Sequence, residues 1–287
     1  MFNLSKAAVL GILTGVVGLL VSLLPFGFEL EENVGLDILF KLRGTRQPPS
    51  DVVVVSIDNA SAVHLNLPDD LKKWPRSLHA RLTDNLARAG AAVIAFDLMF
   101  DEARLATDDD AFAESMRRAR NVVLFELLRR DTVSTPDQPG PPAGPVHSET
   151  LIPPIPAFAQ AAVALAPFPL PKIPVKVGQY WTFKTGAGDM PTLPVVVFQL
   201  FTLKVYDAFK HSVTKVHPSL AAQLPHNKEA LLTTMTVGKF IRLLRDFFAK
   251  MPPDAEKMLI ELQHSPRYTF FLLNGDMEFN RNRQLFV

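Results

Sequence analysis

An uncharged apolar run from Ala7 to Leu24 is the feature that most constrains this chain. As a helix, the run would be about 27 Å long at about 1.5 Å per residue, close to the thickness of a bilayer's hydrocarbon core. No polar face recurs in it at helical spacing, which disfavours a helix buried in a soluble core. Lys6 precedes the run and Glu29, Glu31 and Glu32 follow it, so the positive-inside tendency places the N-terminus in the cytoplasm.

We therefore expect residues 1–28 to form a transmembrane signal anchor and residues 29–287 an extracytoplasmic domain. The protein would be a single-pass protein of the cell inner membrane with the bulk of the chain in the periplasm. A cleaved signal peptide is the main alternative, but its apolar region would be about 7–15 residues long and would end in a small-x-small site. The run ends instead in Leu-Leu-Pro-Phe-Gly, so an uncleaved anchor is favoured.

The composition excludes several kinds of functional site. The chain has no cysteine, which excludes disulfides, thiolate metal sites and a cysteine nucleophile. Its formal net charge is +1 and it has no long basic block, so nothing indicates a nucleic-acid partner. A hydrophobic content of 48% is sufficient for the domain to be stabilised by its own core.

A β-α-β unit is the clearest folding signal. Val52–Ile57 is a nearly continuous β-branched run, as expected of a strand buried on both faces. Trp74-Pro75-Arg76 opens a helix that Gly90 ends, and Ala91–Phe96 forms a second strand, parallel and adjacent to the first. The expected apolar stripe of that helix consists of Leu78, Leu82, Leu86 and Ala89.

The alternation then continues. Asp109 or Asp110 caps a helix that carries Phe112, Met116 and Ala119, and a third strand covers Val122–Phe125. This pattern predicts an α/β sandwich with a largely parallel sheet. Farther on, we expect a loop over residues 131–146, helices at 195–209, 236–250 and 254–263, and a late strand at 268–273.

Candidate ligand-binding residues gather at the expected carboxyl edge of the sheet. Asp58 follows the first strand and Asp97 the second, and ligands of open parallel sheets bind beyond these strand ends. Such a group could bind a cation or a small polar ligand. The full candidate set is Asp58, Arg76, His79, Asp97, Asp101 and Glu102.

Structural roles are the alternative for each of these residues. An aspartate at a strand end often caps the next turn, and a helical histidine is more often a buried hydrogen-bonding residue than a ligand. Arg76 could pair with Asp58 or Asp97 and tie the helix start to the sheet. Asp108, Asp109 and Asp110 have the pattern of a solvated helix start.

Catalytic motifs are missing from the expected positions. The first strand is followed by Ile57-Asp58-Asn59-Ala60-Ser61, which has neither a glycine-rich phosphate loop nor the second aspartate of a haloacid-dehalogenase-like phosphatase. There is also no Gly-x-Ser-x-Gly elbow and no His-Glu-x-x-His zinc motif. We therefore expect no catalytic residue, no metal and no cofactor.

The order of these motifs resembles a type-2 CHASE domain, the cyclase/histidine-kinase-associated sensing extracellular domain. The resemblance is clearest over residues 34–128, fainter at 191–194 and 268–273, and not recognisable from about 210 to 265. The segments that carry it are Val34–Asp37, Arg43-Gly44, Val52–Asp58, Trp74–Arg76 with His79, Ala89–Asp97, Phe100–Glu102, Asp109-Asp110 and Asn121–Leu124.

The resemblance implies a membrane-anchored sensor of an unknown small-molecule or ionic signal. In that family the sensor is normally followed by further membrane helices and a cytoplasmic nucleotide cyclase, histidine kinase or serine/threonine kinase. This sequence stops at Val287 without them, so the output would lie on a missing segment or a partner, and we expect a homodimer. Two alternatives remain: an anchored metal-dependent hydrolase that uses Asp58, Asp97 and Asp101, and a non-signalling remnant.

Overall fold

A computed structural model describes residues 4–23, 35–45, 47, 50–133, 146–170, 181–184 and 188–249. The expected helix at 254–263 and the late strand at 268–273 lie outside these residues. The chain divides into two compact units, Met1–Ala62 with Leu170–Tyr180, and Val63–Pro169 with Trp181–Val287. We call them unit 1 and unit 2.

Unit 1 contains helices α1 (Leu4–Leu23) and α3 (Leu36–Arg43) and the start of α4 (Asn59–Leu65). The apolar side chains of α1 are exposed, with Leu10 at 65% and Ile12 at 67%. Within the described residues, no helix is both long and apolar enough to cross a membrane. The prediction of a transmembrane helix is therefore not supported.

The prediction of a buried strand at Val52–Ile57 is wrong. These residues form no strand, and the side chains of Val53 and Val54 are 79% and 86% exposed. A β-branched run becomes a stable strand only where neighbouring strands supply ladder hydrogen bonds and packing. In the described part of the chain, no strand pairs with this run.

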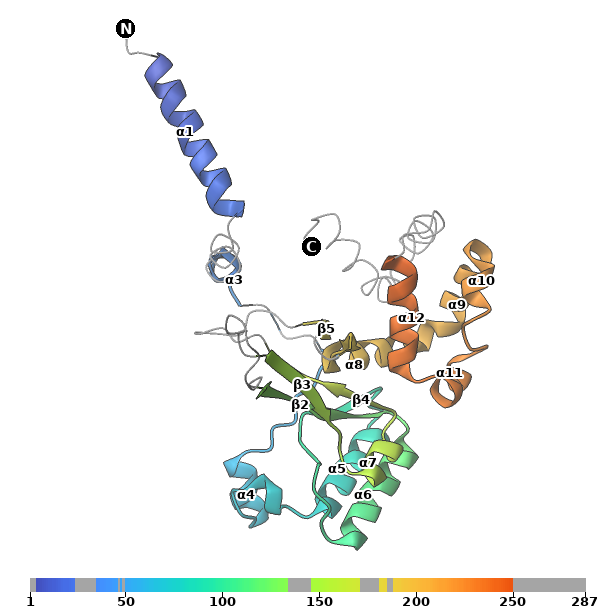
Figure 1. Cartoon of the computed structure of the whole chain (residues 1–287). Coiled ribbons are helices and arrows are strands. Elements are labelled where there is room, and N and C mark those ends of the chain that lie inside the picture. Colours follow the sequence, from blue (N-terminus) through green and yellow to red (C-terminus); the bar gives the residue numbers. More distant parts are fainter. Residues whose placement is uncertain are drawn as a thin grey trace, which may run out of the picture. The chain divides into compact units, whose positions relative to one another are not determined.

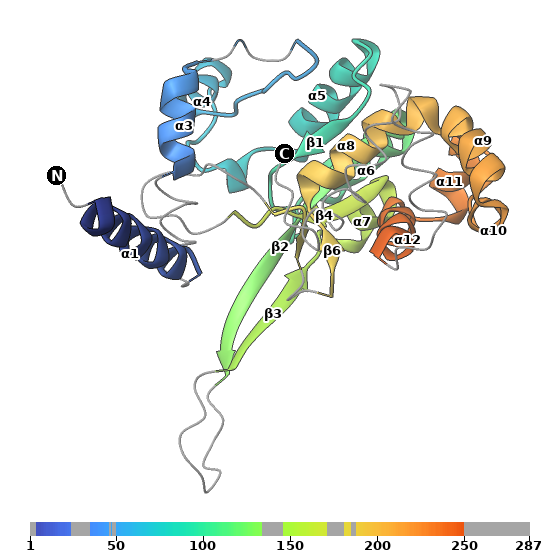
Figure 2. The same ribbon diagram turned by 90° about the horizontal axis from the view of Figure 1, so that it is seen from above.

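Unit 2 contains a mixed sheet between two helical layers. The first half of β2 (Val122–Val133) runs parallel to β1 (Ile94–Phe96) on one side and to β4 (Ala164–Pro167) on the other. From Leu127 onward, β2 pairs with the antiparallel β3 (Val146–Ile152), and this ribbon extends away from the helices (Figure 2). The largely parallel sheet is thus confirmed for β1, β2 and β4, while β3 makes the sheet mixed. A separate pair is formed by β5 (Phe183–Lys184) and β6 (Met190–Pro191).

One face of the sheet is covered by α5 (Arg76–Arg88), α6 (Ala106–Ala119) and α7 (Pro156–Ala161) (Figure 1). Val122 and Leu124 of β2 point to this face, and Phe112 and Met116 of α6 are fully buried against it. Gly90 has a φ of +85°, the left-handed conformation expected after the end of α5. The apolar spacing therefore identified α6, and Gly90 marked the end of α5.

Two details of these helices differ from expectation. α6 begins at Ala106, so neither Asp109 nor Asp110 is its cap. On α5 the buried residues are Arg76, His79, Ala80 and Thr83, whereas Leu82 and Leu86 are only partly buried. The predicted leucine stripe thus lies at the margin of the core.

The other face is covered by helices from the C-terminal half of the described chain. The predicted helix at 195–209 is divided into α8 (Leu193–Thr202), a short 3-10 turn at Leu203–Val205, and α9 (Tyr206–Val216). At the division, the Thr202 hydroxyl donates to the Gln199 carbonyl at 2.8 Å, a local bond that competes with helix continuation. The layer is completed by α10 (Pro218–Ala221), α11 (Lys228–Thr234) and α12 (Val237–Ala249). The short 3-10 turn η2 (Leu71–Lys73) is not part of this layer and precedes α5 in the chain.

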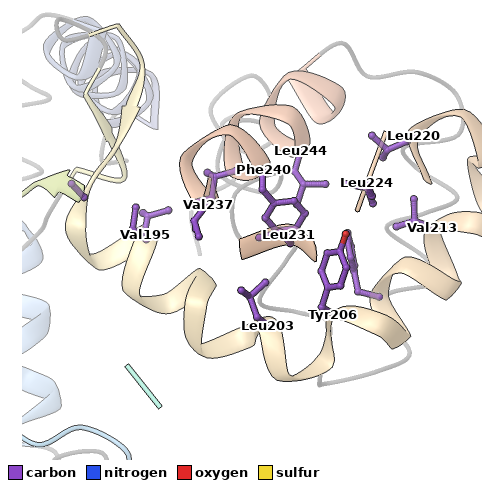
Figure 3. Close-up of a cluster of buried hydrophobic side chains, with 14 of the residues drawn as sticks. Val195, Leu203, Tyr206, Val213, Leu220, Leu224, Leu231, Val237, Phe240 and Leu244 are labelled. Atoms are coloured by element: carbon purple, nitrogen blue, oxygen red, sulfur yellow. The ribbon is translucent and has the colours of Figure 1, made fainter. Parts of the chain in front are cut away.

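Buried side chains unite this second layer (Figure 3). Tyr206, Leu231 and Phe240 are 0% exposed, and Val123 of β2 joins the same cluster from the sheet. The helix α12 matches the one predicted at 236–250. Since Val123 points to this layer and Val122 and Leu124 to the other, β2 is buried on both faces.

Candidate functional site

The carboxyl ends of the parallel strands lie beside the first residues of α5, α6 and α7. Pro75 precedes α5 with an extended backbone, which makes Arg76 the first helical residue. Contacts from Arg76 then join the three helices, because it reaches Asp109 of α6, Phe158 of α7 and Phe100 of the loop after β1. Ligands commonly bind at such an edge of an α/β sheet.

Arg76 is a charged group inside an aromatic core. Its side chain is 2% exposed, and its guanidinium carbon lies 4.4 Å from the ring centroid of Phe100 and 5.7 Å from that of Phe158. Burial, and then the nearby charge of Arg104, lower the pKa of Arg76 to about 10, so the group stays charged at neutral pH. Stacking covers the flat faces of the guanidinium and leaves its in-plane N–H donors available.

The ion pair between Arg76 and Asp109 is loose. Nε of Arg76 lies 3.8 Å from Oδ1 of Asp109, beyond hydrogen-bond distance. Both atoms are buried without a hydrogen-bond partner in the described part of the chain. The other carboxylate oxygen of Asp109 accepts the backbone N–H of Arg104 at 2.7 Å. The arrangement therefore holds opposite charges together while leaving hydrogen-bonding capacity unused.

Arg104 fixes the loop that leads into α6. Its Nη1 donates to the Trp74 carbonyl at 2.7 Å, and the indole N–H of Trp74 donates to the Pro68 carbonyl at 2.7 Å. Trp74 is 4% exposed. These bonds hold the segment before α5 against the segment before α6.

His79 lies one turn after Arg76 and is buried among phenylalanine rings. Its ring centroid is 5.4 Å from that of Phe100 and 5.6 Å from that of Phe112, and its Nδ1 lies 3.3 Å from the Pro75 carbonyl oxygen. Burial, followed by the charge of Arg76, lowers the pKa of His79 to about 4. The ring is therefore neutral at physiological pH and acts as a core residue.

The four predicted acids are placed differently from one another. Asp97 directly follows β1 and is exposed, and Asp101 and Glu102 are exposed in the next loop. The charges of Asp101 and Glu102 act on Arg76, which groups them with it. Asp58 belongs to unit 1, where its Oδ1 accepts the backbone N–H and the hydroxyl of Ser61, both at 2.9 Å. It therefore caps the start of α4, and the partner of Arg76 is Asp109.

Sequence reasoning missed two buried acids. Asp109 is 7% exposed and therefore is not part of a solvated helix start; it precedes Phe112 by three residues and Met116 by seven, a spacing that places all three on one helix face. Glu126 is 8% exposed and continues the alternation of Val122 and Leu124 along β2. Both periodicities are readable in the sequence.

Metal binding finds no support at this edge. Among the described residues, no group of three or more histidine, cysteine, aspartate or glutamate side chains could hold a metal ion. The hydrolase alternative, which needs Asp58, Asp97 and Asp101 around a metal, is therefore not supported.

The comparisons with known proteins give the family. A sequence model described as the CHASE2 domain matches residues 12–260, which is most of the chain. No curated protein and no solved structure matches the chain. The matched range includes both the parallel sheet and the second helical layer, so residues 210–260, which carried no recognisable resemblance, fall within it. The chain belongs to the CHASE2 domain family, a family of extracellular sensory domains.

Proposed function

We propose that this chain is a membrane-anchored extracytoplasmic sensor that binds a small ligand at the carboxyl edge of the parallel sheet in unit 2. The observation that carries the proposal is the buried, loosely paired guanidinium of Arg76. A buried charge with unused hydrogen-bonding capacity is costly for stability, and such groups are concentrated at binding sites. The membership in the CHASE2 family supports the sensory role.

The anchor is part of the proposal and rests on the N-terminal sequence. The proposal is supported by the run of 18 uncharged, mostly apolar residues from Ala7 to Leu24 and by the exposed apolar side chains of α1. Fusing a periplasm-active reporter to either end of the chain tests this topology. Activity of the C-terminal fusion alone is expected, and activity of the N-terminal fusion would contradict it.

The sensor would transmit its state to a cytoplasmic cyclase or kinase. A ligand transmits a signal only if it binds two conformations with different affinity. An anchor helix reports such a difference most simply by rearranging within a homodimer. We therefore propose a dimer, which light scattering of the full chain in detergent tests directly.

Ligand binding is tested by thermal unfolding of the full chain in detergent, screened against anions, cations and neutral metabolites. A ligand is expected to raise the melting temperature, and Arg76→Lys, which keeps the charge but removes the planar fork of N–H donors, is expected to reduce that shift. Arg118→Lys, the same change at an exposed position on α6, is the matched control. If no compound of any class changes the melting temperature, the proposed binding function is wrong.

A further inference from the structure

Glu126 is a buried acid that has neither an ion-pair partner nor a hydrogen-bond partner among the described residues. Its side chain is buried in β2 at 8% exposed, and no described residue forms a hydrogen bond or an ion pair with it. Burial raises the pKa of its carboxyl group, and no neighbouring charge contributes to that shift. The other well-buried acid, Asp109, differs because it has Arg76 and the N–H of Arg104 beside it.

Directly after Glu126, the strand that continues beside β2 changes from β4 to β3. Glu126 pairs with Pro167 of the parallel β4, and the next residue, Leu127, pairs with Ile152 of the antiparallel β3. Glu126 therefore ends the parallel part of the sheet, at the carboxyl edge where α/β sheets bind ligands. Strand alternation places it on the same face as Leu124, toward α5, α6 and α7.

The carboxyl group is buried but not sealed. Among the described residues, some side-chain atoms are inaccessible to solvent and also have no hydrogen-bond partner. They include Nε of Arg76 and Oδ1 of Asp109 but neither carboxylate oxygen of Glu126. Since Glu126 also has no hydrogen-bond partner among the described residues, its oxygens retain contact with solvent. A small group can reach them from the sheet edge.

The charges at this edge favour a cation. Three acids, Asp97, Asp101 and Glu102, are exposed there. Of the two nearby arginines, Arg76 is paired loosely with Asp109, and Nη1 of Arg104 donates to the Trp74 carbonyl. Toward β4, Glu126 faces Pro167, and on β3 the next acid, Glu149, is occupied by Arg130 and Lys184. Negative charges therefore outnumber positive charges at this edge, and an isolated buried carboxylate is stabilised by a cationic partner.

We propose that Glu126 binds the ammonium group of a small organic amine that enters at the carboxyl edge of the parallel strands. The inference deepens the proposed sensory function, because this amine would be the signal. The ammonium would supply the partner that no described residue provides to Glu126. The exposed acids of the loop after β1 would attract the amine to the edge.

The test measures thermal unfolding of the full chain in detergent with straight-chain mono- and diamines of two to six carbons. Butanol and butyrate serve as neutral and anionic counterparts of butylamine, and sodium chloride matches the ionic strength. At saturating amine, the melting temperature of the wild type is expected to rise by about 5 °C. Glu126→Gln should abolish this rise. The same change at Glu114, an exposed acid on α6, is the control and should preserve it.

A second readout separates binding from folding. Without ligand, Glu126→Gln should melt at a higher temperature than the wild type, because it removes an unpaired buried charge. A variant that is more stable yet unresponsive to amines would support the binding role. A variant that is less stable, or that still responds, would overturn it.

The melting experiments distinguish a failure of the amine site from a failure of the proposed sensory function. A melting shift by butyrate but by no amine would overturn the amine site and leave a ligand site near Arg76 standing. No shift by any compound, including the wider metabolite screen, would overturn both.

Discussion

The guanidinium of Arg76 lies 4.4 Å above the ring of Phe100, while its ion-pair partner Asp109 stays 3.8 Å away, outside hydrogen-bond distance. The aromatic contact is thus closer to ideal geometry than the ionic one. This relationship sets what substitutions in the cluster should do.

The coupling between Arg76 and Asp109 can be measured by a double-mutant cycle. Arg76→Met leaves Asp109 as an uncompensated buried charge and is expected to lower the free energy of unfolding by about 3 kcal/mol. Asp109→Asn in the same chain should recover part of that loss. Denaturant unfolding of the four proteins gives the coupling energy.

The exposed pair Arg118 and Asp84, with side chains 54% and 38% exposed, is the control for that cycle. Its coupling energy is expected to stay below about 1 kcal/mol because solvent screens the charges. If the two cycles give equal coupling energies, burial does not strengthen the Arg76 pair.

His79 should make the domain less stable in acid. Its folded pKa of about 4 lies below the unfolded value of about 6.5, so between these pH values the unfolded chain binds the extra proton. The contribution of His79 to stability is therefore complete above pH 6.5 and is lost as the pH falls toward 4, by up to about 3 kcal/mol.

Replacing His79 with phenylalanine tests this pH dependence. The aromatic neighbours Phe96, Phe100 and Phe112 can accommodate the ring, and the variant should lose less stability than the wild type between pH 6.5 and 4. His64→Gln, at an exposed position on α4, should leave the wild-type profile unchanged. Identical profiles for His79→Phe and the wild type would contradict the assignment.

Two donors share one carbonyl group in the second helical layer. The Tyr206 hydroxyl and Nζ of Lys210 both donate to the Pro225 carbonyl, at 2.8 and 2.9 Å. Tyr206→Phe alone should cost about 1 kcal/mol because Lys210 remains as a donor. Lys210→Met should cost more, because its Nζ also donates to the Leu224 carbonyl at 3.0 Å. The double variant should cost more than the sum, and strictly additive effects in chemical unfolding would count against the shared bond.

Asn227 caps α11, where its Oδ1 accepts the backbone N–H of Ala230 at 2.8 Å. Asn227→Ala should therefore lower stability by about 1 kcal/mol in thermal or denaturant unfolding. Thr233→Ala, at an exposed position in the last turn of the same helix, should have little effect, since alanine is the better helix former. Equal losses in the two variants would mean that the cap contributes nothing specific.

Local patterns predicted the helices and the strand that lie in the core. The spacing of Phe112 and Met116 identified α6, Gly90 marked the end of α5, and the apolar run at Val122 identified β2. The same kind of pattern failed at Val52–Ile57, because a strand depends on hydrogen-bonding partners that a local run does not contain.

The candidate site was likewise predicted in part by local sequence patterns and decided in part by the fold. By itself, the sequence determined that Arg76 and His79 begin a helix beside a strand end, because helix spacing and turn residues act over a few positions. Only the tertiary structure decided that Asp109 is the partner of Arg76, that Asp58 caps a helix in the other unit, and that Glu126 is buried with no partner among the described residues. Pairing and burial depend on which distant segments the fold brings together, and no local pattern carries that information.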